Sequence, residues 1–247
     1  MMEIDTIYNE DCITGLNHIP AGSVDLIVTD PPYLLDVVGA GCFGSKNKLY
    51  HHELKGLDEG ITDELILKIL SKCKKINAYF WCNKRQIAQY YKIFDSMGLL
   101  TDMLTWHKTN PTPASNNKYL SDTEYLIFVR EKGVPLYGTY ETKKKFYVSG
   151  INREDKSEWN HPTIKPIDIT KNIIVNSTQE GSVVLDPFIG SGTTAVACLE
   201  TGRHYIGFEI DKEYFDICSN RVSLSKRRET GKTTLDCWSD CKMEAAL

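Results

Sequence analysis

The chain has 247 residues, a formal net charge of −4 and a hydrophobic content of 41%, which suits one large globular domain. No stretch approaches the ~20 apolar residues of a membrane-spanning helix, and the first residues have neither the basic nor the apolar region of a secretion signal. None of the eight cysteines forms a CxxC pair, so we expect reduced thiols in a cytoplasmic protein rather than disulfides or a metal site.

Strands and helices alternate along most of the chain, which predicts an α/β fold with a mostly parallel sheet and helices on both faces. Each expected strand is a short run rich in β-branched and aromatic residues, and the expected helices carry apolar residues on one face. Strands are expected at residues 5–8, 24–29, 77–82, 99–108, 123–131, 182–186 and 204–210. Helices are expected at residues 62–75, 84–98, 165–178, 193–201 and 211–228.

The middle of the chain differs from its flanks in charge and in periodicity. Residues 107–172 hold 11 Lys and Arg against 8 Asp and Glu, although the whole chain is acidic. A basic segment can face phosphates, but lysine-dotted loops are also common on ordinary surfaces. Clear periodicity is lost between residues 133 and 160. We expect an insertion at about residues 111–160 and a loose polar tail at residues 231–247.

An acid, two prolines and an aromatic residue follow the second expected strand directly, as Asp30-Pro31-Pro32-Tyr33. Proline cannot donate to a sheet ladder, so the two prolines end the strand. Asp30 and Tyr33 therefore lie at the carboxyl end of a parallel strand, where open α/β sheets bind ligands. The alternative for Tyr33 is an ordinary core aromatic residue.

A second motif, DPFIGSGT at residues 186–193, leads from a buried strand through a glycine turn into a helix. Gly190 and Gly192 let the backbone approach a ligand closely, and the helix start favours a carboxylate or phosphate. Glu209 ends the next strand, 23 residues after Asp186, where an acid typically binds the hydroxyls of a ribose. The glycines of this turn do not form GxGxxG and are not followed by GK[ST], which favours a nucleoside cofactor over a dinucleotide and argues against a P-loop here. The alternative is a tight turn without a ligand.

Together, these two motifs resemble those of the DNA amino-methyltransferases, which methylate an exocyclic base amine with S-adenosylmethionine. DPPY precedes the glycine motif here, and this permuted order, with a recognition segment between the motifs, is similar to the β class of these enzymes. The resemblance extends over residues 4–227. It implies a Rossmann-like, S-adenosylmethionine-dependent methyltransferase fold with circularly permuted motifs, a catalytic domain at residues 1–230 and target recognition within residues 111–160.

The resemblance also implies which residues bind the cofactor. Residues 9–16 are similar to the segment that holds the cofactor adenine, with Asp11 accepting from its amino group; Asp11 could instead cap a helix. Residues 161–166 are similar to the segment at the methionine end, which places Thr163 and Lys165 near the cofactor carboxylate; a proline-punctuated helix start is the alternative. The implied cofactor-binding residues are Asp11, Cys12, Asp30, Thr163, Lys165, Asp186, Phe188, Gly190, Ser191, Gly192, Thr193, Glu209 and Ile210.

For the reaction, the resemblance implies that the DPPY motif holds the target amine. Asp30 and a backbone carbonyl near Pro31 would accept its two N–H groups, Pro32 would fix the backbone direction, and Tyr33 would stack on the base. The amine then attacks the methyl group in line, with no metal and no covalent enzyme intermediate. A stacked base cannot reach such a site, so we expect base flipping. Residues 36–56 are expected to close over the flipped base or the DNA backbone.

An acid at the first motif position is typical of relatives that act on adenine N6, whereas relatives that act on cytosine N4 mostly carry serine there. We therefore predict an adenine-specific methyltransferase of double-stranded DNA. The alternatives are a cytosine-N4 enzyme, an RNA or protein-glutamine methyltransferase and an inactive DNA-binding relative. A homodimer and a separate cognate restriction endonuclease are the further partners that the resemblance allows. Candidate DNA contacts, chosen by residue type, are Asn116, Asn117, Lys118, Lys143, Lys144, Lys145, Asn152 and Arg153.

Overall fold

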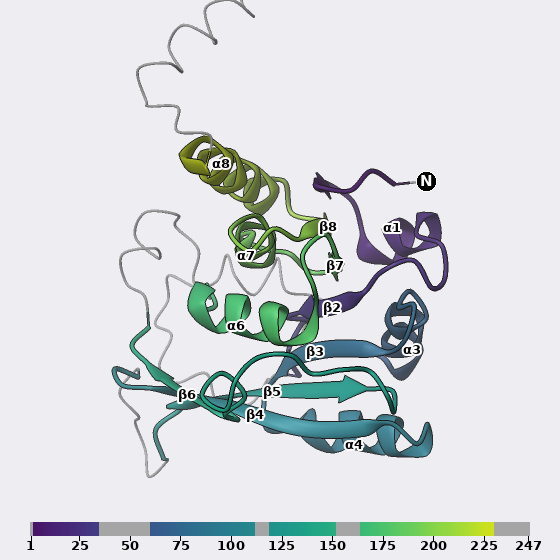
Figure 1. The fold of residues 1–247 in the computed structure, drawn as a ribbon, viewed down its shortest axis with the longest axis vertical. Coiled ribbons are helices and arrows are strands. Elements are labelled where there is room, and N and C mark those ends of the chain that lie inside the picture. Colours follow the sequence, from purple (N-terminus) through teal and green to yellow (C-terminus); the bar gives the residue numbers. More distant parts are fainter. Residues whose placement is uncertain (1, 35–59, 112–118, 152–163, 230–247) are drawn as a thin grey trace, which may run out of the picture.

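The computed structural model describes residues 2–34, 60–111, 119–151 and 164–229, which form one sheet flanked by helices (Figure 1). The strands are β1 (Thr6–Tyr8), β2 (Leu26–Thr29), β3 (Asn77–Cys82), β4 (Leu100–Lys108), β5 (Thr123–Arg130), β6 (Phe146–Ser149), β7 (Val183–Asp186) and β8 (His204–Phe208). The helices are α1 (Cys12–His18), α3 (Asp63–Leu70), α4 (Ile87–Ser96), α6 (Ile167–Ser177), α7 (Thr193–Leu199) and α8 (Lys212–Glu229).

The sheet has the strand order β1-β8-β7-β2-β3-β5-β4-β6. All neighbouring pairs are parallel except those of β5, which runs antiparallel to both β3 and β4. The carboxyl ends of the parallel strands and the amino end of β5 therefore lie at one edge of the sheet, which we call the carboxyl edge. From β2 the chain continues to β3 on one side, whereas β7 lies on the other side. Open α/β sheets bind ligands at such a switch in strand order.

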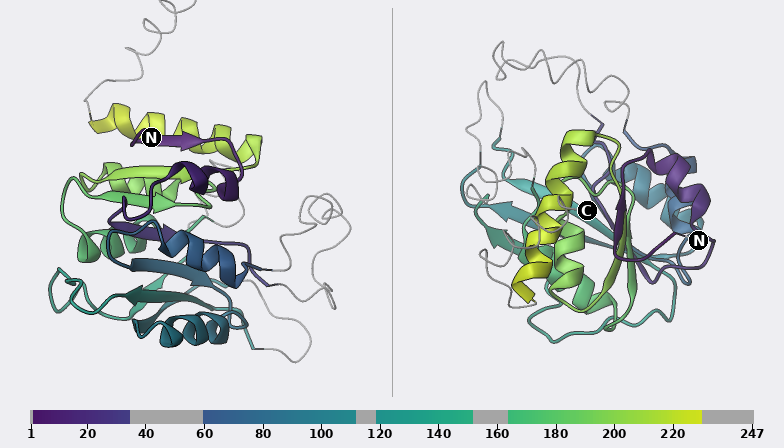
Figure 2. Two further views of the ribbon diagram at one scale, coloured as in Figure 1. Left: turned by 90° about the vertical axis from the view of Figure 1, so that its right-hand side faces the viewer. Right: turned by 90° about the horizontal axis from the view of Figure 1, so that it is seen from above.

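Helices cover both faces of the sheet, and the two orthogonal views in Figure 2 show this arrangement. One core cluster packs α1, α3 and α4 against one face, and the other packs α6, α7 and α8 against the opposite face. Side chains of β2 alternate between them, with Leu26 and Val28 in one cluster and Ile27 in the other. All residues of β2 and β3 are buried, as expected for strands covered on both sides. The predicted fold class is confirmed.

Local sequence signals set several element boundaries. The hydroxyl of Thr62 accepts a hydrogen bond from the backbone N–H of Leu65, 3.2 Å away, and α3 begins directly after this N-cap. Gly98, with φ of 68°, follows the end of α4. Val24 forms only an isolated bridge with Cys73, so β2 begins at Leu26, later than expected.

The range 111–160 was expected to hold an insertion, but two of its segments belong to the sheet. β5 lies between β3 and β4, and β6 forms the edge of the sheet beside β4. The apolar run of β5 is long enough to be buried in the sheet, whereas β6 is a short strand whose Phe146 and Val148 are exposed. The insertion stays a prediction for the rest of this range; residues 112–118 and 152–160, like the tail at 231–247, lie outside the described residues.

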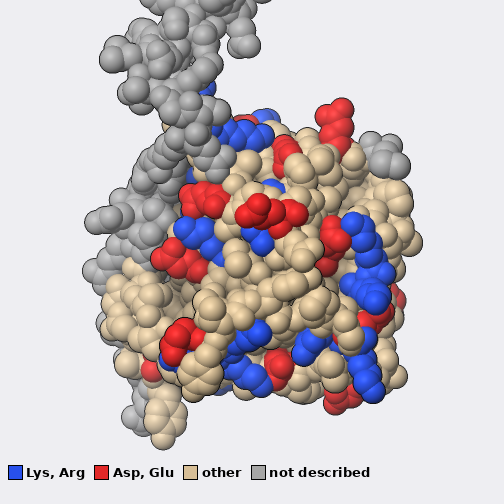
Figure 3. Space-filling model, viewed as in Figure 1, with Lys and Arg blue, Asp and Glu red and all other residues tan. Residues whose placement is uncertain are grey.

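None of the helices in the described part of the chain has the length and apolar character that a bilayer crossing requires. Acidic and basic side chains are interspersed on the face seen in Figure 3. This face therefore shows no extended surface of a single charge.

Candidate active site

Asp30 and Asp186 lie at the carboxyl edge of two neighbouring parallel strands. Ile27 of β2 pairs with Leu185 of β7. Asp186 is the last residue of β7 and Asp30 directly follows β2, so both acids lie at the same edge of the sheet. A pocket of about 400 Å³, including space open to solvent, is lined by both acids. The rest of its wall comes from β2, from Trp81 of β3, from residues of α6 and its approach, and from residues 188–191, 193 and 194. The two sequence motifs thus form one site.

Hydrogen bonds to Asp186 shape the turn after β7. Its Oδ1 accepts from the backbone N–H of Phe188 (3.1 Å), and its Oδ2 accepts from the hydroxyl of Thr194 (2.6 Å). Burial raises the pKa of Asp186 from 3.8 to about 7, although both hydrogen bonds oppose this rise. Asp186 and Phe188 are both predicted to contact the cofactor, and both line the pocket.

The glycines of this turn are required by its geometry. Gly190 and Gly192 have φ of 51° and 83°, which glycine adopts without steric cost. A Cβ at Gly192 would lie 2.5 Å from Sγ of Cys218 on α8. Ser191 and Thr193 are buried and line the same pocket. Gly190 and the hydroxyl-bearing residues Ser191 and Thr193 thus lie in the wall of the pocket, and their contacts with the cofactor stay predictions.

Glu209 links the end of β8 to the glycine turn. Its Oε2 accepts from the backbone N–H of Gly190 (3.0 Å), and its Oε1 accepts from the N–H of Asp211 (2.9 Å). A carboxylate has about four acceptor positions, so each oxygen can accept a further bond, as binding of ribose hydroxyls would require. The neighbouring Ile210 is 65% exposed. Cofactor contacts of both residues stay predictions.

The adenine segment and the methionine segment of the cofactor site are described only in part. Asp11 is the N-cap of α1 and accepts from the backbone N–H of Ile13 at 2.6 Å, so the capping alternative is realised. Cys12, the first residue of α1, is buried. Thr163 lies outside the described residues. The proposed contacts of Asp11, Cys12 and Thr163 with the cofactor therefore stay predictions.

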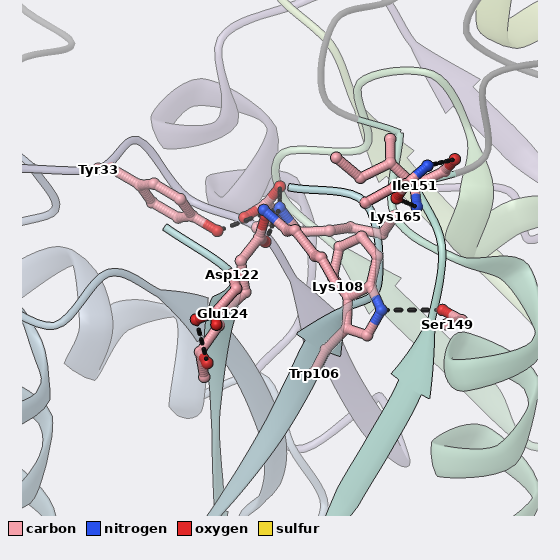
Figure 4. A network of polar contacts seen from close by, with 11 residues as sticks. Tyr33, Trp106, Lys108, Asp122, Glu124, Ser149, Ile151 and Lys165 are labelled. Atoms are coloured by element: carbon pink, nitrogen blue, oxygen red, sulfur yellow. Dashed lines mark hydrogen bonds and ion pairs between the residues drawn. The ribbon is translucent and has the colours of Figure 1, made fainter. Parts of the chain in front are cut away.

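Lys165 lies at the centre of a cluster of charges at the carboxyl edge (Figure 4). Its Nζ is 2.7 Å from Oδ2 of Asp30, 3.1 Å from Oε2 of Glu124 and 3.1 Å from the hydroxyl of Tyr33. Glu124 also forms an ion pair with Lys108. The structure thus brings Lys165 to the DPPY motif, and its contact with the cofactor carboxylate stays a prediction.

Burial and neighbouring charges act in opposite directions in this cluster. Burial raises the pKa of Asp30 above its ordinary value, although Lys165 lowers it. Burial alone would lower the pKa of Lys165, but Asp30, Tyr33 and Glu124 raise it well above its ordinary value. Lys165 is therefore a cation, and its charge is balanced by the surrounding acids.

The DPPY motif is fixed by the turn between β3 and α4. The side-chain amide of Gln86 donates to the carbonyl oxygen of Pro32 (3.1 Å), and that of Asn83 donates to the carbonyl oxygen of Leu34 (2.7 Å). Pro31 is buried. Oδ1 of Asp30 is buried and has no hydrogen-bond partner among the described residues. The motif therefore presents one unused carboxylate oxygen.

Sequence reasoning missed several residues of this site. Lys108 and Glu124 reach it because β5 runs antiparallel, which brings its amino end and the carboxyl end of β4 to the carboxyl edge. An antiparallel return after the proline-rich loop was the signal that could have indicated them. Arg221 of α8 donates to the hydroxyl of Thr193 (3.0 Å) and to the carbonyl oxygen of Ser191 (3.2 Å). Nothing in the sequence distinguishes Arg221 from its basic neighbours.

The candidate DNA contacts are only partly described. Lys144 pairs with Glu141, and Lys145 pairs with Asp102 of β4. Both lysines precede β6, which runs parallel to β4, so they lie away from the carboxyl edge, as does Lys143. The other candidates, Asn116, Asn117, Lys118, Asn152 and Arg153, and the segment 36–56 lie outside the described residues.

Comparison with known proteins decides the family. A family model described as DNA methylase (N6_N4_Mtase) matches residues 24–220, which include both motifs. The chain belongs to the DNA methylase family. It is 29% identical to the type II methyltransferase M2.MboI of Moraxella bovis, over 90% of this chain and 86% of that protein. It is 28% identical to M2.DpnII of Streptococcus pneumoniae, over 87% and 88%.

Solved structures agree with this assignment. A crystal structure of an M1.HpyAVI–SAM complex matches with a TM-score of 0.67 and 26% identity, over 87% of this chain and 98% of that one. The cytosine-N4-specific PvuII DNA methyltransferase matches with a TM-score of 0.65 at 15% identity, over 90% and 91%, which shows a shared fold alone. The predicted DNA methyltransferase family is confirmed, and the M1.HpyAVI neighbour was solved as a complex with SAM.

Proposed function

We propose that this DNA methylase transfers the methyl group of S-adenosylmethionine to the N6 amine of an adenine that is flipped out of duplex DNA. The observation that carries this proposal is Oδ1 of Asp30, a buried acceptor without a partner among the described residues, on a side chain that lines the pocket. An exocyclic amine offers two N–H donors, and an ionised carboxylate only accepts. By resemblance, an acid at this position favours adenine over cytosine.

The donor set of the pocket fits S-adenosylmethionine. Gly190 lines the pocket, and its turn permits close approach of the backbone. Beside the pocket, Glu209, which accepts from the N–H of Gly190, and Asp11 would supply carboxylate acceptors for the hydroxyl and amino groups of the cofactor. When bound, the sulfonium supplies an electrophilic methyl group.

The chain contributes position and charge to the reaction. Oδ1 of Asp30 accepts one N–H of the amine, which turns the nitrogen lone pair towards the methyl group. The carbonyl of Pro32 is bound by Gln86, so the carbonyl of Pro31 is the candidate acceptor for the other N–H. As the bond forms, the Asp30 carboxylate stabilises the positive charge that develops on nitrogen. The surplus proton leaves after methyl transfer.

We propose further that the partners are those of a modification enzyme. Duplex DNA is the substrate, and recognition residues lie in the segments of 111–160 outside β5 and β6. Two relatives are named type II methyltransferases, which supports a separate cognate restriction endonuclease and a place in the cytoplasm with the DNA. A homodimer is the remaining partner, and light scattering of the free protein tests it.

Product analysis tests the proposed function. Mixed-sequence duplex DNA is incubated with the protein and tritiated S-adenosylmethionine, then digested to nucleosides and separated. We expect the label in N6-methyladenine. Label in N4-methylcytosine would overturn the base assignment, and label in RNA or protein only would overturn the substrate class.

A further inference from the structure

Glu124 and Lys108 lie beyond the DPPY motif, and neither is part of it. We propose that Glu124, held by Lys108, is a positioning residue for methyl transfer: it shares the Lys165 ammonium with Asp30 and so keeps Oδ1 of Asp30 free for the target amine. The inference rests on the proposed function in one respect, that the amine binds at Asp30.

The surroundings of Lys165 support this sharing. Three oxygens lie within 3.1 Å of Nζ, one each from Asp30, Glu124 and Tyr33. The contact with Glu124 is an ion pair, because Oε2 of Glu124 has no hydrogen-bond partner among the described residues. Nζ also lies 5.3 Å from the centroids of the Tyr33 and Trp81 rings. The ammonium therefore lies between the two acids and is nearest Oδ2 of Asp30, while Oδ1 of Asp30 has no hydrogen-bond partner among the described residues.

Lys108 holds Glu124 in place. It forms an ion pair with Oε1 of Glu124, whereas Lys165 lies nearest Oε2, so each carboxylate oxygen has its own cation (Figure 4). Nζ of Lys108 also lies 5.1 Å from the centroid of the Trp106 ring. The four charges alternate in sign from Asp30 to Lys108, an arrangement that offsets the cost of their burial.

Loss of the Glu124 charge would change both the geometry and the charge at Asp30. Without Glu124, the only acid left beside Lys165 among the groups described here is Asp30, so the ammonium would move onto both of its oxygens and compete with the amine. The unbalanced cation would also oppose the positive charge that develops on the amine. Both effects slow the chemical step and leave the cofactor pocket intact.

The same change predicts a shift in the pH profile. Glu124 raises the pKa of Asp30, and Lys165 lowers it. The other titratable groups coupled to Asp30 are Tyr33, Cys82, Tyr90 and Asp186, and the substitution leaves them in place. Methyl transfer needs ionised Asp30, so activity falls as the pH drops through its pKa. Removal of the Glu124 charge lowers this pKa and moves the acid limb to lower pH.

The test is Glu124→Gln, measured as single-turnover methyl transfer against pH, with S-adenosylmethionine binding by calorimetry. We expect the rate to fall about tenfold or more, equivalent to ~1.4 kcal/mol, with cofactor affinity within about twofold and the acid limb at lower pH. Lys108→Met should act in the same direction, and Lys108→Arg should retain most of the activity. Asp102→Asn is the matched control, because it breaks the ion pair with Lys145 on the same strand, away from the site, and should leave rate and profile unchanged.

A wild-type rate and an unchanged acid limb in Glu124→Gln would overturn the inference, and so would a slow variant whose acid limb stays in place. These outcomes leave the proposed function standing if wild-type protein methylates adenine. If it methylates another base, the same variants are compared on that base. If it methylates no base, the proposed function fails, and the role of Glu124 is then tested without activity. NMR titration of ¹³C-aspartate-labelled protein, with the Asp30 signal assigned by Asp30→Asn, measures the pKa of Asp30. An equal pKa in wild-type protein and Glu124→Gln would overturn the inference.

Discussion

Glu209 accepts a hydrogen bond from the backbone N–H of Gly190 at 3.0 Å, and thereby joins the end of β8 to the turn after β7. Its other oxygen accepts from the backbone N–H of Asp211, so one buried carboxylate holds both the turn after β7 and the backbone just before α8. We expect Glu209→Gln to raise the Kd for S-adenosylmethionine about 10- to 100-fold. The glutamine amide has only one oxygen, so it can accept from only one of the two backbone N–H groups. Hydrogen bonds to a charged group contribute roughly 1.5–3 kcal/mol.

Calorimetry with the free cofactor measures this effect. The matched control is Glu200→Gln, because Glu200 is an exposed acid that forms an ion pair with Lys171 outside the pocket. Its Kd should stay within about twofold of the wild-type value. Equal affinity of Glu209→Gln and wild-type protein for S-adenosylmethionine would contradict the prediction that Glu209 binds the ribose hydroxyls.

Gly192 is required by two independent constraints, a φ of 83° and the proximity of Cys218. We expect Gly192→Ala to lower the free energy of unfolding by about 2–5 kcal/mol, since left-handed strain costs ~1–2 kcal/mol and overpacking a further ~1–3 kcal/mol. Gly181→Ala should cost only the strain, because Gly181 has φ of 78° but no atom within 4 Å of a built Cβ. Urea unfolding compares the two, and equal losses would contradict the role of Cys218.

Asp186 makes the stability of the protein depend on pH. Its pKa is raised by burial from 3.8 to about 7, so the folded state keeps a proton that the unfolded state loses. The stabilisation is complete below about pH 4 and is lost as the pH rises towards 7. Asp186→Asn mimics the protonated acid. As the pH rises from 4 to 7, the free energy of unfolding of the variant should therefore increase relative to that of the wild type, by up to about 4 kcal/mol at ~1.4 kcal/mol per pH unit. A constant difference between the two proteins over this pH range would contradict the raised pKa.

Local signals made much of the fold and site predictable. The prolines that end β2, the glycines that follow β7 and the N-cap at Thr62 act through their own backbone chemistry, so their effects can be inferred without knowledge of the tertiary structure. For this reason both motifs lie where the sequence placed them, at neighbouring strands of one edge.

Features that depend on pairing between distant segments could not be predicted in this way. The antiparallel course of β5 and the edge strand β6 follow from how segments pack, and the short, half-exposed pattern of β6 resembles a loop. The positions of Glu124 and Lys108 depend on this pairing. Lys165 was assigned by resemblance to the cofactor carboxylate, and its place beside Asp30 becomes visible only in three dimensions.

The role of the Asp30 carboxylate is tested most directly by Asp30→Ala, assayed by single-turnover methyl transfer to duplex DNA together with calorimetric binding of S-adenosylmethionine. We expect methyl transfer to fall by a factor of about 10²–10³ or more, while cofactor affinity changes by less than about threefold, because the glycine turn and Glu209 are untouched. Near wild-type turnover in this variant would contradict the claim that the Asp30 carboxylate holds the target amine.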